Sequence, residues 1–205
     1  MDIGDYVVHI VDDEEPVRKS LAFLLTIAGF TVRVHESATA FLAAAPAIRK
    51  GCLITDLRMP DINGLELLQR LRGMNLAIPS VVITGHGDVP MAVEAMKAGA
   101  VDFIEKPFDD NVLIQAITHA AERLVEGRNV EDVGEIQARL SHLTEREREV
   151  LSGVVAGLPN KTIAYDLQIS PRTVEVHRSN VMAKMRARSL PELVRMAIAA
   201  GFATK

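Results

Sequence analysis

Five polar side chains that together could transfer a phosphoryl group end or follow four apolar runs of the sequence. They are Asp12, Asp13, Asp56, Thr84 and Lys106. Short runs rich in Val and Ile are typical of buried strands. Because open parallel sheets bind ligands outside the carboxyl ends of their strands, we expect these five side chains to share one pocket.

The chemistry of that pocket centres on Asp56, which ends the apolar stretch GCLITD. Carboxylates packed together repel one another and stay charged only beside a cation, and a hard divalent ion such as Mg²⁺ fits oxygen ligands. The Asp56 carboxylate could then attack a phosphoryl group in line, while Thr84 and Lys106 bind its oxygens. The product would be an aspartyl phosphate. Taken singly, Asp56 is a turn former or helix N-cap, and Lys106 is a solvated charge.

An alternation of strand and helix patterns predicts the fold that positions these residues. Strands are predicted at Tyr6–Val11, Thr31–His35, Cys52–Thr55, Pro79–Thr84 and Val101–Glu105. Helices are predicted from Pro16 to about Gly29 and at Ser37–Ala45, Gly64–Arg72, Val89–Ala98 and Asp109–Leu124. Five such units predict an α/β domain with a parallel sheet covered on both faces. Right-handed crossovers favour a doubly wound, flavodoxin-like strand order 2-1-3-4-5.

Length and charge divide the chain into two domains and a linker, because 205 residues exceed one typical domain. Residues 1–124 carry 11 basic and 17 acidic residues (−6), residues 125–141 carry 2 and 4 (−2), and residues 142–205 carry 10 and 6 (+4), which sum to the net charge of −4. An acidic α/β domain, a linker and a small basic all-α domain are predicted over these ranges. Only the basic domain is expected to meet nucleic acid.

The cellular compartment is predicted from what the sequence lacks. Cys52 is the single cysteine, so no disulfide can form within the chain and a reducing cytoplasm fits. Residues 1–5 carry no basic apolar leader, and no run approaches the roughly 18 apolar residues of a membrane span. We expect a soluble, cytoplasmic protein without membrane insertion.

The linker and the basic domain contain five helix patterns. Val133, Ile136 and Leu140 have helical spacing, so part of the linker is predicted to be an amphipathic helix that docks on one of the domains. Capping signals then open helices after Thr144, Pro159, Ser170 and Ser189. A short helix at Lys161–Leu167, a tight turn and a longer helix from Pro171 to about Met185 have the outline of a helix-turn-helix.

The longer of these two helices is predicted to enter the major groove of DNA. Val174, Val181 and Met185 can face the core, which leaves Glu175, Val176 and Ser179 able to reach base edges. The residues placed for backbone phosphates are Lys161, Arg172, Thr173 and His177. The alternative is a small helical bundle with a solvated basic face.

Three stretches resemble the receiver domain of bacterial two-component response regulators: VDDEEPVRKSL, ITDLRMPDINGLELL and VVITGHGDVPMAVEAMKAGAVDFIEKPF. The resemblance covers about residues 5–124. It implies that Asp56 is the phosphoacceptor and that Asp12 and Asp13 are the acidic pair around Mg²⁺. It further implies that the backbone carbonyl of Arg58 is a metal ligand.

The same resemblance implies how phosphorylation is sensed. Thr84 and Lys106 would be the switch hydroxyl and the phosphate-sensing lysine. Phe103 occupies the aromatic switch position and would change rotamer. Val93 and Lys97 become candidate contacts of a homodimer that forms on phosphorylation.

The C-terminal stretches LTEREREVL and VVAGLPNKTIAYDLQISPRTVEVHRSNVMAKM resemble the LuxR/FixJ-type DNA-binding domain. The two domains together are similar to the nitrogen-fixation regulators of rhizobia. That similarity implies a FixL-like, oxygen-responsive sensor histidine kinase as phosphodonor. It also implies double-stranded promoter DNA and RNA polymerase as partners, and activation of nitrogen-fixation genes; a different sensor and pathway is the alternative.

Two other classes of protein share parts of this pattern. A phosphatase that works through an aspartyl phosphate would also use Asp, Mg²⁺, Thr and Lys, but such enzymes usually carry a second Asp two residues after the nucleophile. Arg58 stands there instead, so we predict that the protein is not an enzyme. A protein-interaction module whose receiver takes no phosphate and whose tail binds a protein is the other alternative.

Overall fold

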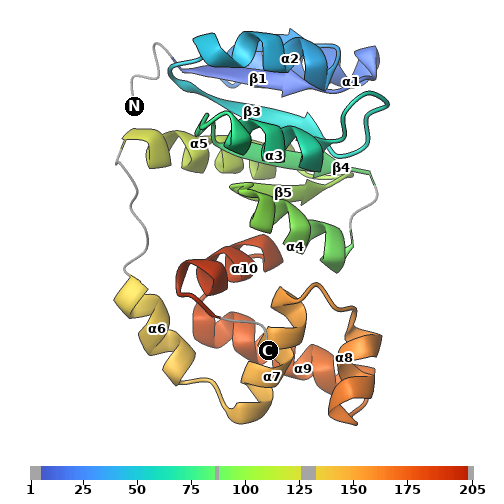
Figure 1. Ribbon diagram of the computed structural model, residues 1–205, viewed down its shortest axis with the longest axis vertical. Coiled ribbons are helices and arrows are strands. Elements are labelled where there is room, and N and C mark those ends of the chain that lie inside the picture. Colours follow the sequence, from blue (N-terminus) through green and yellow to red (C-terminus); the bar gives the residue numbers. More distant parts are fainter. Residues whose placement is uncertain (1–5, 86–87, 126–132, 203–205) are drawn as a thin grey trace. The chain divides into compact units, whose positions relative to one another are not determined.

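The computed structural model describes residues 6–85, 88–125 and 133–202 of the chain. The chain forms two compact units, one of Met1–Gly87 with Ala98–Arg128 and one of Asp88–Lys97 with Asn129–Lys205. The first unit contains a β-sheet, and the described part of the second is helical (Figure 1). Within the described ranges, no helix is both long enough and apolar enough to cross a membrane.

The first unit is built on a five-stranded parallel sheet in the order β2-β1-β3-β4-β5. The strands are β1 (Val7–Val11), β2 (Thr31–His35), β3 (Gly51–Asp56), β4 (Ser80–Thr84) and β5 (Asp102–Glu105). All four neighbouring pairs are parallel. The predicted doubly wound α/β fold and its strand order are therefore confirmed, and the carboxyl ends of the strands share one edge of the sheet.

Helices cover both faces of this sheet (Figure 1). Helices α1 (Glu15–Ile27) and α5 (Asp110–Val125) pack on one face, and α2 (Ala38–Ala44) and α3 (Gly64–Gly73) pack on the other. Side chains alternate between the faces along each strand, so each face has its own apolar core. The core beneath α1 and α5 includes Val8, Ile10, Leu25, Leu113 and Ile117. The opposite core includes Val11, Phe41, Leu53, Leu67 and Leu71.

Two histidines pack against Phe41 of the second of these cores. The Nδ1 atom of His9 on β1 is 3.0 Å from the Nε2 atom of His35 on β2, and the two rings stack with centroids 5.3 Å apart. Phe41 packs edge-on against both rings. Only 3% of His9 is exposed, and burial lowers the pKa of His9 to about 4, with the neighbouring His35 and Arg33 adding to the shift. Burial also lowers the pKa of His35.

This pair is expected to make the stability of the first unit depend on pH. The folded state binds fewer protons than the unfolded state, so the free energy of unfolding should fall as pH drops below about 6.5 and should level off near pH 4. The loss attributable to His9 is on the order of 3 kcal/mol. Urea unfolding at pH 7.5 and pH 5 measures it, and His9→Leu should reduce the difference between the two pH values. An equal difference in wild type and variant would count against this role.

The second unit contains a bundle of five described helices, of which the first lies within the predicted linker. They are α6 (Val133–Ser141), α7 (Glu145–Val155), α8 (Asn160–Leu167), α9 (Pro171–Met185) and α10 (Leu190–Ala199). Ile136 and Leu140 of α6 are buried in a core with Leu151, Val181 and Met185. The prediction that the linker contains an amphipathic helix docked on a domain is confirmed. Helix α4 (Val89–Ala98), which also belongs to this unit, has the predicted bounds.

Side-chain caps fix where these helices begin. Thr144 and Glu147 form the predicted capping box at the start of α7, and Ser170 and Ser189 cap α9 and α10. Glu147 is also buried and accepts a hydrogen bond from Lys184 Nζ, 2.7 Å away. This ion pair ties the first turn of α7 to the last turn of α9.

Candidate functional site

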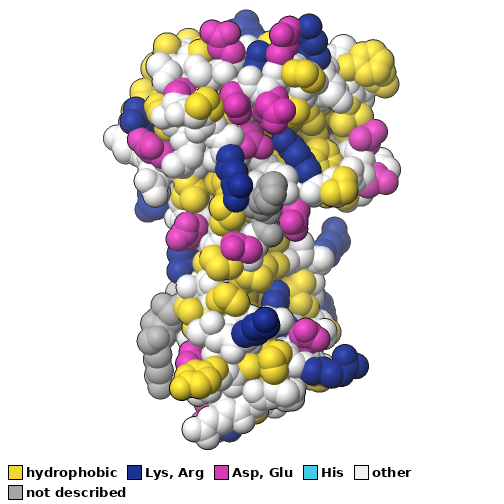
Figure 2. Space-filling model, turned by 90° about the vertical axis from the view of Figure 1, so that its right-hand side faces the viewer, with side chains coloured by type: hydrophobic (Ala, Val, Ile, Leu, Met, Phe, Trp, Pro, Cys, Tyr) yellow, Lys and Arg dark blue, Asp and Glu magenta, His cyan; other side chains and the backbone are white. Residues whose placement is uncertain are grey.

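The predicted phosphoryl-transfer residues meet at the carboxyl edge of the sheet. Asp56 and Thr84 are the last residues of β3 and β4, Asp12 and Asp13 directly follow β1, and Lys106 directly follows β5. The strand register keeps these ends level, since β1 pairs with β3 up to Thr55 and β4 pairs with β5 up to Glu105. Figure 2 shows acidic side chains gathered on the sheet-containing unit with basic side chains beside them.

Lys106 joins the two central carboxylates. Its Nζ atom is 3.1 Å from Oδ1 of Asp56 and 3.5 Å from Oδ2 of Asp12. The other oxygen of Asp56 accepts a hydrogen bond from the backbone N–H of Arg58 at 2.6 Å. The side chain of Asp56 is 12% exposed and that of Asp12 only 4%. Asp56 therefore retains access to solvent, while Asp12 is enclosed.

The charges in this site are only partly balanced. Burial raises the pKa of the Asp12 carboxyl, despite the hydrogen bond that it accepts from the Glu14 N–H and the positive charge of Lys106. Burial opposes the charge on Lys106, but the hydrogen bonds and negative charges of Asp56 and Asp12 outweigh it and raise the pKa of the lysine. One ammonium group thus contacts two carboxylates. Its positive charge only partly offsets the unfavourable free energy of burying the charged form of Asp12.

Backbone contacts hold the strand ends of this site in place. A Cβ atom at Gly64 would lie 2.5 Å from the carbonyl oxygen of Asp56, so the first turn of α3 can approach β3 only because that residue is glycine. The N–H of Lys106 donates to the carbonyl of Thr84 at 2.7 Å, and the Lys106–Pro107 peptide bond is cis. Arg18 donates to the carbonyl of Asp12 at 2.7 Å. The contacts of Gly64 and Arg18 were not predicted, because neither follows from spacing along the chain.

The other residues predicted to act in this site differ in how exposed they are. Asp13 and Arg58 are exposed beside the central group, Thr84 is buried, and Phe103 on β5 is half-buried opposite Val82 of β4. Among the residues that the structure describes, no three His, Cys, Asp or Glu side chains are gathered closely enough to hold a metal ion by themselves. The three carboxylates of the predicted magnesium set, Asp12, Asp13 and Asp56, therefore do not form such a group in this conformation.

The two predicted dimer contacts on α4 differ in exposure. Lys97 is exposed, whereas Val93 is only 1% exposed. The chain in this conformation does not present the Val93 side chain to a partner. The dimerisation role of both residues stays a prediction.

The DNA-binding prediction concerns α8 and α9, which a turn through Gln168 joins. Gln168 is left-handed (φ 55°) and ends α8, and Ser170 begins α9 two residues later. Val174, Val181 and Met185 are buried, as predicted. The three residues predicted to read bases, Glu175, Val176 and Ser179, are all exposed.

The residues predicted to contact phosphates fall into two groups. Lys161 and Arg172 are exposed. Thr173 and His177 are half-buried, and the Thr173 hydroxyl lies 2.8 Å from the Ser170 hydroxyl at the helix cap. The Nδ1 atom of His177 is buried without a hydrogen-bond partner among the described residues. Lys161 and Arg172 are therefore the cations best presented to a DNA backbone.

Two further basic residues of α9, Arg178 and Lys184, form contacts within the second unit. Arg178 donates to the Asn160 side chain at 2.7 Å and so ties α9 to the start of α8, and burial lowers the pKa of this arginine. Lys184 forms the ion pair with Glu147. Neither partner could be predicted from the sequence, since they lie 18 and 37 residues away.

Two family profiles match the chain. The profile described as "Response regulator receiver domain" matches residues 8–118, and the profile described as "Bacterial regulatory proteins, luxR family" matches residues 141–197. The first covers the sheet with its strand-end site. The second covers α7, α8 and α9.

Whole-chain relatives and solved structures agree with these matches. The chain is 71% identical to "Transcriptional regulatory protein FixJ" of Rhizobium meliloti (strain 1021), over 97% of this chain and 98% of that protein. It is 42% identical to "Response regulator protein TodT" of Pseudomonas putida, over 93% and 84%. A crystal structure of full-length FixJ from B. japonicum is 49% identical and covers 96% of this chain and 98% of its own, with a TM-score of 0.58. A crystal structure of FixJ-N is 71% identical over 58% and 94%, with a TM-score of 0.56.

Proposed function

The chain belongs to the response regulators that join a receiver domain to a LuxR-type DNA-binding domain, and we propose that phosphorylation of Asp56 by a sensor histidine kinase makes it bind promoter DNA as a dimer. The observation that carries this proposal is the strand-end site. There a partly exposed Asp56 carboxylate contacts Lys106 beside a buried Asp12. The exposed face of α9 would bind the DNA.

The residues of the site divide the work of phosphoryl transfer. Asp56 supplies the attacking oxygen, and the Arg58 N–H and Lys106 Nζ hold its two oxygens and so orient the carboxylate. After transfer, the ammonium of Lys106 and the hydroxyl of Thr84 would bind oxygens of the new phosphoryl group. Thr84 is buried before the reaction. Its movement toward the phosphate would therefore transmit the effect of phosphorylation to the rest of the domain.

We propose that Mg²⁺ is held by Asp12, Asp13, Asp56 and the Arg58 carbonyl. Their carboxylate and carbonyl oxygens are the ligands that this ion prefers, and the burial of Asp12 beside the single ammonium group of Lys106 supports a further cation there. When bound, the ion would neutralise charge on the transferring phosphoryl group. Asp12 and Asp13 would hold the ion, and Asp56 would remain the nucleophile.

The proposed partners follow from the two domains. A histidine kinase would supply the phosphoryl group. The phosphorylated protein would then bind double-stranded promoter DNA, and RNA polymerase would be its partner in transcription. The similarity to relatives named FixJ supports nitrogen-fixation genes as targets and a FixL-like kinase as donor. These partners would meet the protein in the cytoplasm. Arg58 occupies the position where an aspartyl-phosphate phosphatase usually has its second Asp, so we propose a regulator and not an enzyme.

One experiment tests both halves of this function. Acetyl phosphate with Mg²⁺ should raise the mass of the protein in sedimentation to that of a dimer and should tighten its binding to promoter DNA in a gel shift. Mg²⁺ alone, without acetyl phosphate, is the control. If phosphate is incorporated but neither mass nor DNA affinity changes, the receiver does not control the second domain.

Lys97→Glu is expected to weaken the phosphorylation-dependent dimer without reducing phosphate incorporation. Lys97 is exposed on α4, so the variant changes a surface charge, whereas a charge at buried Val93 would also destabilise the fold. Moving a population from 1:99 to 99:1 takes about 5.5 kcal/mol, so loss of one contact should shift the dimer constant measurably. Sedimentation equilibrium measures the shift. Lys50→Glu, the same change at another exposed lysine, is the matched control and should dimerise as the wild type does.

A further inference from the structure

Arg18 makes a contact at the strand-end site that the proposed phosphoryl transfer does not use. The residue lies in α1 and is half-buried, and its Nη1 atom donates to the backbone carbonyl of Asp12 at 2.7 Å. The guanidinium thus reaches back from the helix to the residue that follows β1. Since a hydrogen bond from a charged donor is roughly twice as strong as a neutral one, this contact can hold the backbone of the turn between β1 and α1.

A second contact in this turn uses the carboxylate of Asp12 itself. Its Oδ1 atom accepts a hydrogen bond from the N–H of Glu14, the N-cap residue of α1, at 2.9 Å. A metal ion that binds this carboxylate would compete for the lone pairs of the same oxygen. The bond from Arg18 goes to the carbonyl and occupies neither carboxylate oxygen. It is therefore the contact of the two that an ion at the carboxylate leaves in place.

The backbone of this turn decides where two of the proposed metal ligands point. Asp13 is exposed and lies between Asp12 and the N-cap of α1. Among the described residues, the carboxylates of Asp12, Asp13 and Asp56 are not gathered into a metal site in this conformation. An ion must therefore draw these side chains together, and a backbone that is already held lowers the free energy that this requires.

We propose that Arg18 is a positioning residue for the metal site, which holds the turn through the carbonyl of Asp12 so that Asp12 and Asp13 can bind Mg²⁺. This inference rests on the proposed function, because it concerns the ion proposed there. It predicts a sign that charge alone does not give. Arg18 is a cation beside a cation site, so its removal would tighten Mg²⁺ binding if it acted only by its charge. Its removal weakens Mg²⁺ binding if it holds the turn.

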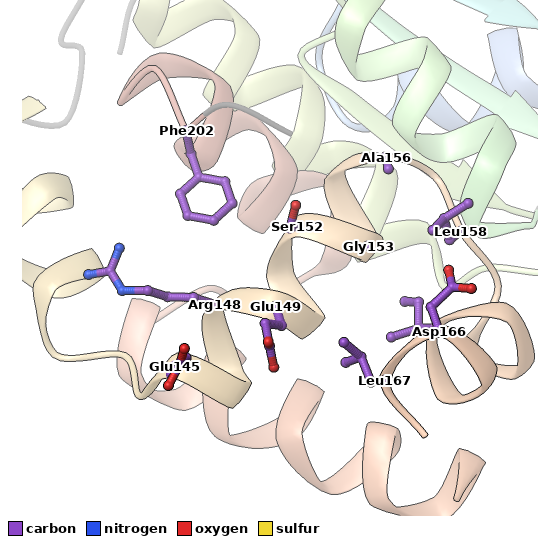
Figure 3. Close-up of a pocket in the computed structure, with 11 residues that line it drawn as sticks. Glu145, Arg148, Glu149, Ser152, Gly153, Ala156, Leu158, Asp166, Leu167 and Phe202 are labelled. Atoms are coloured by element: carbon purple, nitrogen blue, oxygen red, sulfur yellow. The ribbon is translucent and has the colours of Figure 1, made fainter. Parts of the chain in front are cut away.

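Two other residues supply matched controls. Lys19 follows Arg18 on α1 and forms an exposed ion pair with Glu15 at 2.7 Å, so Lys19→Met removes the same charge without removing the bond to the turn. Arg148 lines an open groove beside α7 (Figure 3) and is half-buried, as Arg18 is. Its guanidinium donates to the carbonyl of Leu140 on α6, so Arg148→Met removes the same kind of bond in the second unit.

Calorimetric titration of Mg²⁺ into the full-length protein measures the affinity without any phosphorylation. Arg18→Met is expected to raise the dissociation constant roughly tenfold, because loss of a group that orients a metal ligand typically costs about 10–100-fold in affinity. Arg18→Gln is a second variant and should change the affinity in the same direction. Both controls should remain within about twofold of the wild type, since an exposed charge contributes little. Circular dichroism checks the fold of each variant.

Labelling by acetyl phosphate gives a second measurement that needs no contact with a kinase. Arg18→Met should require roughly tenfold more Mg²⁺ for half-maximal labelling. Its rate at saturating Mg²⁺ should equal that of the wild type, because Asp56 and Lys106 are unchanged. A residue that only stabilised the fold would not produce this split.

Mg²⁺ binding as tight as that of the wild type, or tighter, in a folded Arg18→Met or Arg18→Gln variant overturns this role. Normal labelling by acetyl phosphate at every Mg²⁺ concentration, combined with a loss of labelling by the kinase, also overturns it and makes Arg18 a contact of the kinase. A wild-type protein that takes up phosphate but binds no Mg²⁺ would instead contradict the proposed metal site, and this role of Arg18 with it.

Discussion

Asp56→Asn is expected to abolish phosphate incorporation from a histidine kinase or from acetyl phosphate, while the protein stays folded. The amide has nearly the shape of the carboxylate, so its oxygen can still accept a hydrogen bond from the Arg58 N–H or from Lys106. It lacks the anionic oxygen that attacks phosphorus. Labelling with radioactive phosphate measures the loss, and circular dichroism checks the fold.

Two comparisons make this test specific to the site. Asp61→Asn makes the same change five residues further on, where the carboxylate only caps the backbone and hydroxyl of Thr39, and it should leave labelling intact. Asp12→Ala should raise the Mg²⁺ concentration needed for labelling, while Asp56 itself remains able to react. Undiminished label of the acid-labile and base-labile kind in Asp56→Asn would assign the phosphoacceptor to another residue.

The sequence was sufficient to predict the strand-end site, because that site depends on local patterns and on one rule of parallel sheets. Asp56 and Thr84 end apolar runs, and parallel strands bring such ends to one edge. Helix starts were predictable for a similar reason, since capping residues act on backbone groups two or three positions away. Thr144, Ser170 and Ser189 all cap as their types indicate.

The contacts that were not predictable join side chains far apart in the chain. The stacking of His9 on His35 depends on the register of β1 with β2, and the pairing of Glu147 with Lys184 depends on how α7 crosses α9. Helical periodicity likewise could not decide which apolar side chains of α4 are covered, and Val93 is buried. Such contacts follow from tertiary packing, which can override a surface position inferred from periodicity.

The basic residues of α8 and α9 differ in whether they are exposed to DNA. Arg178 and Lys184 are engaged within the second unit, so their loss should lower its stability. Lys161 and Arg172 are exposed and available for phosphates. Positive charge counted over the whole domain therefore overstates the charge that faces DNA, and the salt dependence of binding should reflect the exposed cations.

Substitutions on α8 and α9 are expected to separate affinity from specificity. Lys161→Ala and Arg172→Ala should weaken binding to every DNA sequence and lower the salt slope by about one unit each, because each would remove one proposed phosphate contact. Glu175→Ala and Ser179→Ala should instead change the preference among sites, since one good contact to a base edge discriminates by about 1–3 kcal/mol. Affinities for a panel of single-base variants, measured at several salt concentrations, distinguish the two effects.

The same experiment locates α9 on the DNA. A two-fold dimer presents two copies of this helix, so the preferred site should be an imperfect inverted repeat with half-sites about one helical turn apart. Val176 is 53% exposed between the two polar reading residues, and Val176→Ala should lower discrimination at a thymine methyl more than overall affinity. If Glu175→Ala and Arg172→Ala cause the same uniform loss on every sequence, or if footprinting shows one unsymmetrical half-site, α9 does not read bases in the major groove as proposed.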